Sequence, residues 1–344
     1  KWQKTYRIMD RYTIEREIAE SPRSNVVEST DATTGKTVIM EHRCNTVSDD
    51  EFFTSEKELA IVKQLDHPCI AKLIESFEDN DESYFVFEKR GGKTLREVME
   101  EGKITDEIIA LHVAHQLLSA IAHLHEKNIV HKNIKPENIL VDEENDATLF
   151  NFGIAQQLES PDDHGNEMVY SREYAAPEVS TKGTYDLSYD IWSLGVVLYE
   201  LSTGHLPFKD QQSILNGEYD PMPEHTLKEI IESMLRVEES TRPPARELCF
   251  RVVEEIEKHL SSASWSIEDE KLVAKIGGVK EVYTISSYLG KDAYSEVKLC
   301  VGLSDSFRVA LKDIKKNSDS KSIEGFENEA AIIRQLDHPN VVRY

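Results

Sequence analysis

The sequence predicts an α+β protein with two lobes, strand-rich first and mainly helical second, followed by part of another strand-rich lobe. Short apolar stretches at residues 12–14, 26–27 and 38–40 are divided by turn residues, and further strands fit 70–77 and 84–88. Long apolar helices follow at about 108–124 and 187–201. Gly91-Gly92 separates the two patterns, and strands on one side of such a joint with helices on the other indicate two packed lobes.

One helix is expected inside the strand-rich lobe, over residues 52–64. Leu59, Ile61, Val62 and Leu65 recur at helical spacing, and Asp66-His67-Pro68 ends the pattern.

The chain contains an internal repeat. Residues 64–68 recur at 335–339, and the same shift carries 12–14 onto 283–285. We therefore predict a lead-in at 1–11, a first domain at 12–260 and a partial second copy at 283–344. Residues 261–282 are expected to form a linker with a helical turn or two in 267–275.

The charge of the chain is strongly asymmetric. The 344 residues have a formal net charge of −24, and residues 1–261 carry 28 basic and 51 acidic side chains, or −23. Such a field disfavours nucleic acid and anionic membranes and favours either basic protein partners or simply a well-solvated surface.

Cysteine spacing and hydropathy predict a cytoplasmic protein. The four cysteines stand far apart without a C-x-x-C pair, which fits a reducing compartment and neither a zinc site nor a disulfide framework. The longest apolar run, near 191–201, is too short to cross a bilayer, so no membrane partner is expected.

Residues 131–138 read His-Lys-Asn-Ile-Lys-Pro-Glu-Asn. This stretch resembles the catalytic loop of the protein kinase family, H-R-D-x-x-x-x-N, and its Lys-Pro-Glu-Asn wording is similar to serine/threonine kinases. The resemblance implies the two-lobed kinase fold and retains Lys135 and Asn138. The catalytic Asp is replaced by Asn133, whose amide cannot accept a proton near neutral pH.

The nucleotide-binding positions implied by the resemblance also differ from the family pattern. The three glycines of the phosphate loop are replaced by Ala19, Ser21 and Ser24. The lysine that should pair with Glu58 of the helix is Glu41, which we expect to point to water or to pair with its neighbours His42 or Arg43.

The metal-binding Asp of the D-F-G segment is Asn151, in Asn151-Phe152-Gly153. An amide offers Mg²⁺ one neutral oxygen where a carboxylate would carry charge.

The scaffold of the family is retained. The resemblance places Val62, Leu73, His131 and Phe152 in an apolar column between the lobes, anchored by Asp190. It also pairs Glu178 of Ala-Pro-Glu with an arginine, here Arg242. The second copy keeps a lysine and its partner, Lys312 and Glu329, without a catalytic loop.

These replacements lead to the hypothesis that the chain is not an enzyme but an inactive kinase-fold module, a regulator or scaffold. No cofactor or metal is then expected, and the partners are proteins, with a kinase domain in the same chain as one candidate. One alternative is a low-activity ATP-dependent serine/threonine kinase with a displaced base and metal site, which would need ATP and Mg²⁺. Another is a switch that binds ATP without Mg²⁺ and does not hydrolyse it.

Overall fold

The chain divides into two compact units, one within residues 1–264 and 275–280 and the other within residues 265–274 and 281–344. The computed structural model describes residues 11–20, 24–44, 55–79, 82–90, 92–102, 107–166, 171–260, 264–268, 271–276, 279–291, 295–302 and 308–314.

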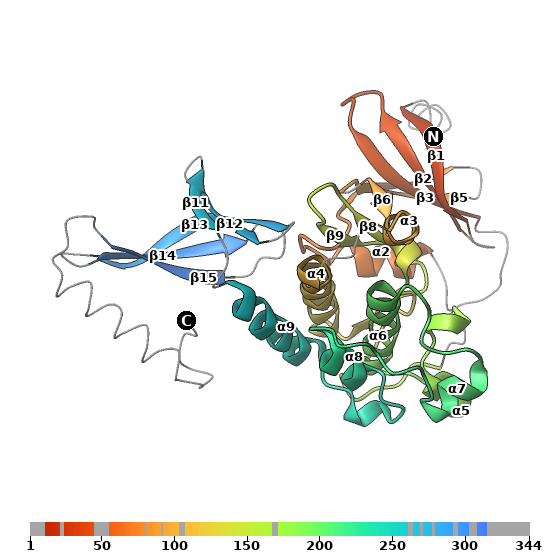
Figure 1. The fold of residues 1–344 in the computed structure, drawn as a ribbon. Coiled ribbons are helices and arrows are strands. Elements are labelled where there is room, and N and C mark those ends of the chain that lie inside the picture. Colours follow the sequence, from red (N-terminus) through yellow and green to blue (C-terminus); the bar gives the residue numbers. More distant parts are fainter. Residues whose placement is uncertain are drawn as a thin grey trace. The chain divides into compact units, whose positions relative to one another are not determined.

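The first lobe of the first unit is an antiparallel sheet in the order β1-β2-β3-β5-β4, with helix α2 as its helical element (Figure 1). The elements are β1 (Tyr12–Glu20), β2 (Ser24–Asp31), β3 (Thr37–Cys44), α2 (Ser55–Val62), β4 (Leu73–Asp79) and β5 (Glu82–Glu88). Helix α2 is shorter than the predicted span of 52–64, because the chain enters turns after residue 62 and residues 52–54 lie outside the described part.

The second lobe is mainly helical. Its helices are α3 (Leu95–Glu100), α4 (Glu107–His125), α5 (Pro177–Thr181), α6 (Ser188–Thr203), α7 (Gln211–Asn216), α8 (Lys228–Met234) and α9 (Ala245–Leu260). The connections between the helices include two small sheets, with the strand orders β6-β8-β9 and β10-β7. Their strands are β6 (Lys93–Thr94), β7 (Ile129–Val130), β8 (Ile139–Val141), β9 (Ala147–Leu149) and β10 (Gln156–Gln157).

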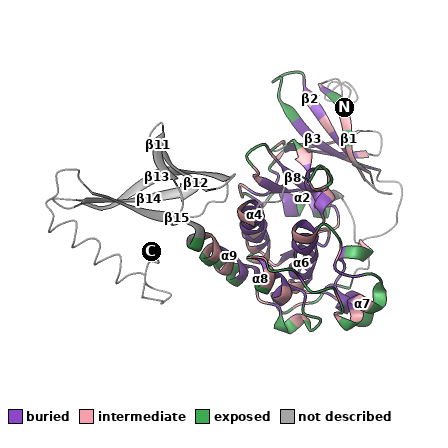
Figure 2. Ribbon diagram, viewed as in Figure 1, coloured by how far each residue is buried: buried purple, intermediate pink, exposed green. Residues whose placement is uncertain are grey.

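The core of this lobe is built on α4 and α6, which are largely buried (Figure 2). Both helices are apolar on nearly every face because other elements cover them on all sides. Among the described residues, α4 alone is long and apolar enough to cross a membrane, and 67% of that apolar window is buried inside the domain, as expected of a core helix.

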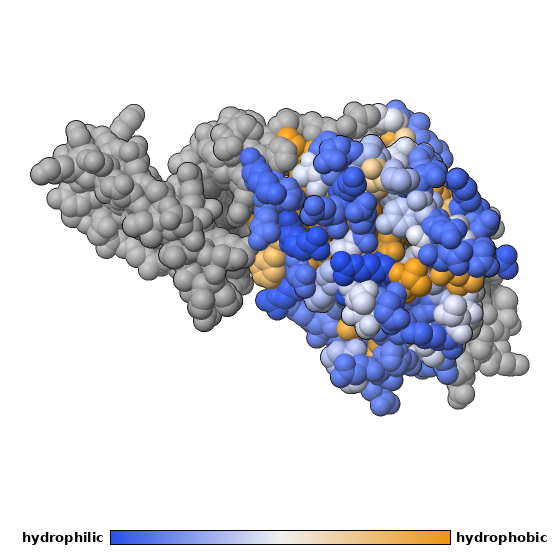
Figure 3. Space-filling view, turned by 60° about the horizontal axis from the view of Figure 1, so that its bottom comes forward, coloured by the Kyte–Doolittle hydropathy of each residue, from blue (hydrophilic) through white to orange (hydrophobic). Residues whose placement is uncertain are grey.

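The coloured part of the face shown in Figure 3 is dominated by hydrophilic side chains with small apolar patches between them. The exposed large apolar residues of the described part are scattered singly, as is usual for a folded domain: Ile14, Ile74, Val237 and Phe250.

A further sheet, most of whose residues belong to the second unit, has the order β11-β12-β13-β14-β15. Its strands are β11 (Ser264–Glu268), β12 (Lys271–Ile276), β13 (Val279–Lys291), β14 (Ser295–Gly302) and β15 (Arg308–Ile314). Its β13-β14 pair repeats the register of β1-β2, from Tyr283 opposite Gly302 onward, at the shift of the internal repeat.

Even the irregularities of the register are repeated. The β1-β2 pair has register shifts between Ile14 and Arg16 and between Glu17 and Ala19, and β13-β14 has them at the corresponding places, after Ile285 and after Tyr288. A β-bulge depends on local backbone conformation, so similar sequences bulge at the same positions.

The helical turn predicted at 267–275 is wrong, since residues 267–268 belong to β11 and residues 271–275 to β12. Leu272, Ala274 and Ile276 alternate with other residues at the period of two that fits a pleated strand, and pairing with neighbouring strands stabilises that form. The α+β, two-lobed prediction for the first domain is confirmed.

Candidate active site

The loop at residues 131–138 is held by a buried carboxylate from helix α6. Asp190 accepts hydrogen bonds from the backbone N–H groups of His131, at 2.8 Å, and Lys132, at 3.0 Å. Lys132 has a left-handed backbone, with φ of 66°, which is a strained conformation for a side chain of this kind. Two charge-assisted hydrogen bonds from one fully buried side chain hold this turn in place.

Two asparagines of this loop, Asn133 and Asn138, meet a third from the following segment, Asn151. Asn138 donates from Nδ2 to the backbone oxygen of Asn133, at 2.8 Å, and Asn151 donates from Nδ2 to Oδ1 of Asn138, at 3.0 Å. Asn151 has a φ of 66°, a left-handed conformation that Asn tolerates better than most residues. The retained Lys135 lies in the same loop and is half-buried.

These amides make a poor site for Mg²⁺. Oδ1 of Asn138 already accepts a hydrogen bond, and neither Asn138 nor Asn151 carries the charge that a hard cation prefers in its ligands. No group of three or more His, Cys, Asp or Glu side chains within the described ranges could hold a metal ion. The residues present therefore do not fit a carboxylate-bound Mg²⁺.

Glu41 of β3 and Glu58 of α2 both contact the same cationic side chain, that of Arg43 in β3. Nη2 of Arg43 donates to Glu41 at 2.9 Å, and its Nε lies 3.2 Å from the carboxylate of Glu58. The three residues are only 1%, 8% and 3% exposed in the order Glu41, Arg43, Glu58. Glu41 therefore does not point to water, and the expected pairing with Arg43 is confirmed.

Two carboxylates on one guanidinium leave one negative charge in excess. Burial, and then repulsion by Glu41, raise the pKa of Glu58 to about 8, against the opposing attraction of Arg43. The oxygens of Glu58 also lack a hydrogen-bond donor of good geometry among the described residues. Glu58 thus favours its neutral form near pH 7.

Arg43 also contacts the segment that carries Asn151. Its Nη1 donates to the backbone oxygen of Gly153 at 3.0 Å. A Cβ atom at position 153 would lie 1.4 Å from Nη2 of Arg43, so only glycine leaves room for the guanidinium in this position. One side chain therefore links β3, α2 and the segment 151–153.

The apolar column between the lobes is present. The rings of His131 and Phe152 meet edge to face with centroids 4.7 Å apart, and both side chains are fully buried. Val62 is buried and Leu73 is half-buried against the same core. Burial also lowers the pKa of His131, which keeps its ring neutral within the column.

The predicted pair of Glu178 and Arg242 is confirmed. Nη1 and Nη2 of Arg242 each donate to a different carboxylate oxygen of Glu178, both at 2.7 Å, and both side chains are buried. This two-point pairing ties α5 to the loop before α9.

Sequence reasoning missed a second arginine at the site, Arg96 of α3. Its guanidinium bonds Glu137 of the catalytic loop at 2.8 Å, Glu200 of α6 at 2.7 Å and the hydroxyl of Tyr174 at 2.6 Å. No local pattern indicates this contact, because Arg96 and Glu200 are 104 residues apart in the chain.

Several predicted positions are described only by their backbone or not at all. Ala19 lies in β1 and Ser24 begins β2, whereas Ser21 lies outside the described residues. In the second copy, Lys312 of β15 is opposite Val297, as Glu41 is opposite Val26 in the first. Glu329 lies outside the described residues.

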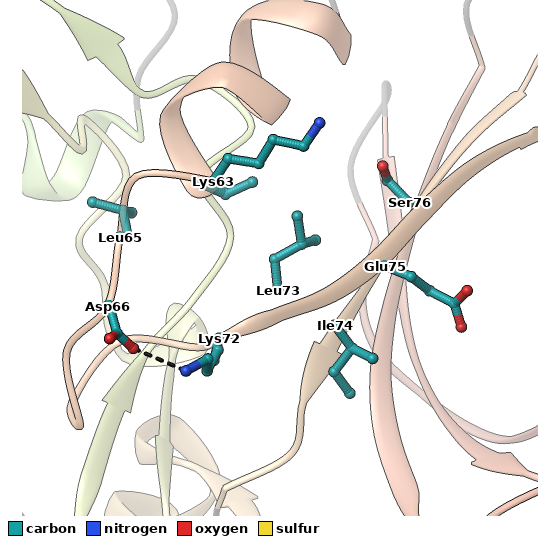
Figure 4. Close-up of a pocket in the computed structure, with 9 residues that line it drawn as sticks. Lys63, Leu65, Asp66, Lys72, Leu73, Ile74, Glu75 and Ser76 are labelled. Atoms are coloured by element: carbon teal, nitrogen blue, oxygen red, sulfur yellow. Dashed lines mark hydrogen bonds and ion pairs between the residues drawn. The ribbon is translucent and has the colours of Figure 1, made fainter.

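A separate cavity of about 420 Å³ lies between the end of α2 and β4 (Figure 4). Leu73 points toward the helix end, Ile74 points away from it, and Lys72 pairs with Asp66 at the rim. None of the three asparagines, nor Glu41, Arg43 or Glu58, lines this cavity.

Comparison with known families places residues 12–253 in the family described as "Protein kinase domain", and residues 283–344 match "Protein tyrosine and serine/threonine kinase". The calcium/calmodulin-dependent protein kinase cmkA of Emericella nidulans is 32% identical over 64% of this chain and 57% of its own length. Serine/threonine-protein kinase PrkC of Bacillus subtilis is 35% identical over 60% and 33%, respectively. CBL-interacting protein kinase 26 of Oryza sativa is 30% identical over 68% and 50%.

The matches thus span about a third to somewhat more than half of these relatives. They contradict the prediction that the chain is not an enzyme, because relatives at 30% to 35% identity are named as protein kinases. That prediction treated each replaced side chain as a lost function. With its family match covering residues 12–253, the chain belongs to the protein kinase family.

Proposed function

We propose that this protein is an ATP-dependent serine/threonine protein kinase of low activity. One observation carries the proposal: Asp190 holds the catalytic loop in place, and Asn133, Asn138 and Asn151 are connected there by hydrogen bonds. The serine/threonine kinases among the relatives support the choice of acceptor.

The proposed reaction transfers the γ-phosphoryl group of ATP to a serine or threonine hydroxyl. A bond forms between the hydroxyl oxygen and the γ-phosphorus, the bond from that phosphorus to the bridging oxygen breaks, and ADP leaves. The hydroxyl proton passes to solvent water. Because the transition state of phosphoryl transfer is loose, positioning and charge stabilisation contribute more than early proton removal.

Asn133 supplies orientation without a base in this proposal. Its side-chain oxygen can accept a hydrogen bond from the substrate hydroxyl but cannot take the proton. Loss of a general base typically costs about 10²- to 10⁴-fold in rate, which is why we propose low activity and not the usual turnover of the family.

The test measures transfer of label from γ-³²P-ATP to serine- and threonine-containing peptides, with the full chain as enzyme. Basic peptides are the first choice because of the acidity of residues 1–261. Asn133→Asp should raise kcat by about 10²-fold or more, since it restores the base. Asn138→Ala should abolish transfer, because it removes the link between the loop and Asn151.

Asn216→Asp is the matched control, an exposed asparagine on α7 far along the chain from the loop. It should leave the rate unchanged. Label incorporation that is the same in the wild type, Asn133→Asp and Asn138→Ala would contradict the proposed function.

A further inference from the structure

Building on the proposed kinase function, we propose that Arg43 is a positioning residue that replaces the missing lysine at position 41. From β3 it holds α2 and the segment 151–153, and so sets the place of the nucleotide phosphates. The inference starts from strand geometry. Side chains two residues apart in a strand point to the same face, so Arg43 reaches the face of the sheet on which Glu41 stands.

Position along the strand favours this role. In the pairing of β2 with β3, Glu41 is opposite Val26 and Arg43 is opposite Ser24, the first residue of β2. Arg43 is therefore displaced by two residues toward the β1-β2 turn, the turn that covers phosphates in proteins that this chain resembles. A long side chain can offset such a displacement, and an arginine reaches further than a lysine.

The contacts of Arg43 are those that a positioning cation needs. It pairs with Glu58 of α2 at 3.2 Å, and it donates to the Gly153 oxygen at 3.0 Å. Its Nε and Nη2 also donate to Glu41, at 3.1 Å and 2.9 Å, and these bonds fix the guanidinium from the side where the lysine would stand. A planar group with donors on three sides can hold three partners at once, which an ammonium at position 41 could not do with the same geometry.

The charges of the neighbouring residues support the same role for Arg43. Glu41 and Glu58 are both buried, and the described residues around them supply no cation in contact except Arg43. Without Arg43, incoming phosphates would meet one or two buried carboxylates and no positive charge, which strongly disfavours binding. Arg43 is thus the group whose positive charge offsets these carboxylates and makes this part of the domain compatible with a nearby anion.

The experiment compares three variants of the full chain with the wild type. Arg43→Met removes the cation. The double variant E41K/R43L moves the positive charge back to position 41 and leaves an apolar side chain at 43. Arg246→Met is the matched control, an exposed arginine whose surface contact is with Glu126 at 3.4 Å.

Two quantities are measured: KM for ATP and kcat in peptide phosphorylation, and the rise in Tm caused by millimolar ATP. Arg43→Met should raise KM for ATP by about ten-fold or more and remove the ATP-dependent rise in Tm. E41K/R43L should return KM for ATP to within about three-fold of the wild-type value and should restore the ATP-dependent rise in Tm. Arg246→Met should change neither.

If Arg43→Met does not fold, a second double variant, E41Q/R43M, takes its place and is compared with E41K/R43L. E41Q/R43M removes one carboxylate with the cation, so it should fold yet bind ATP as weakly as expected for Arg43→Met. A merely structural arginine would predict equal KM in both double variants, which would overturn the inference.

The two proposals fail in different ways. If the wild type transfers phosphate and E41Q/R43M does so with unchanged KM, the role of Arg43 is refuted and the kinase function stands. If the wild type transfers no phosphate but ATP raises its Tm only when a cation is present at 41 or 43, the kinase function falls and the role of Arg43 stands. If ATP neither reacts with the wild type nor stabilises it, both fall.

Discussion

Nδ2 of Asn151 lies 3.0 Å from Oδ1 of Asn138 and donates a hydrogen bond to it. In this arrangement the two amides satisfy each other directly, and no positive charge is needed between them. Two ionised carboxylates would instead repel and require a cation to bring them together. The pairing explains how the site can be stable without an acidic residue at position 151.

We predict that Asn151→Asp makes the protein responsive to Mg²⁺. The new carboxylate offers a charged oxygen beside Asn138, so Mg²⁺ with ATP should stabilise the variant by roughly 1–2 kcal/mol more than it stabilises the wild type. Thermal unfolding with ATP, in Mg²⁺ and in EDTA, measures the difference. Asn151→Ala is the control without a carboxylate, and a Mg²⁺ response as large in that control would refute the prediction.

The free energy of unfolding should fall as the pH rises toward alkaline values, because Glu58 then loses its proton in the folded protein. Its folded-state pKa of about 8 lies above the ordinary 4.5, so the folded protein binds this proton more tightly than the unfolded chain. The contribution is full below about pH 4.5 and is lost as the pH rises through about 8, at up to about 1.4 kcal/mol per pH unit in that window.

Urea unfolding at pH 6, 7 and 8.5 tests this dependence, with Glu58→Gln as the control that cannot titrate. The free energy of unfolding of the wild type should decline more steeply than that of Glu58→Gln. Parallel curves would contradict the raised pKa of Glu58.

Removing the guanidinium of Arg242 should destabilise the helical lobe severely. Arg242→Ala leaves the buried carboxylate of Glu178 unpaired, and we expect a loss of about 3–5 kcal/mol in the free energy of unfolding. Arg242→Lys keeps the charge without the two-point geometry and should lose less. Arg246→Ala, on the surface, should stay within about 0.5 kcal/mol; a similar value for Arg242→Ala would show that the buried pair contributes little.

Asp190→Asn should loosen the catalytic loop while the rest of the lobe stays folded. An amide can accept a hydrogen bond but carries no charge, so the backbone N–H groups of His131 and Lys132 lose charge-assisted partners worth about 1.5–3 kcal/mol. Native-state hydrogen exchange should accelerate at these two amides. Asp220→Asn, an exposed site, is the control, and unchanged protection at 131 and 132 would contradict the anchoring role of Asp190.

Much of the fold could be read from the sequence because its signals are local. Apolar residues at periods of two and 3.6 identify strands and helices wherever one face is buried, and they separated the two lobes here. The resemblance to the kinase family also placed Asn133, Asn138 and Asn151 at one site, and it paired Glu178 with Arg242. The same local reasoning chose a helical turn for 267–275, where a short segment offers too few residues to distinguish the two periods.

Tertiary structure alone decided which charges share a buried site. The strand pattern does not say whether Arg43 faces solvent or a carboxylate, and only the docking of α2 against β3 brings the carboxylate of Glu58 within 3.2 Å. The contact of Arg96 with Glu200 likewise joins residues 104 apart. The sequence by itself determined most of the elements and the positions at which the chain departs from the family's motifs. Whether a replacement is compensated depends on through-space distances, which short-range patterns do not contain.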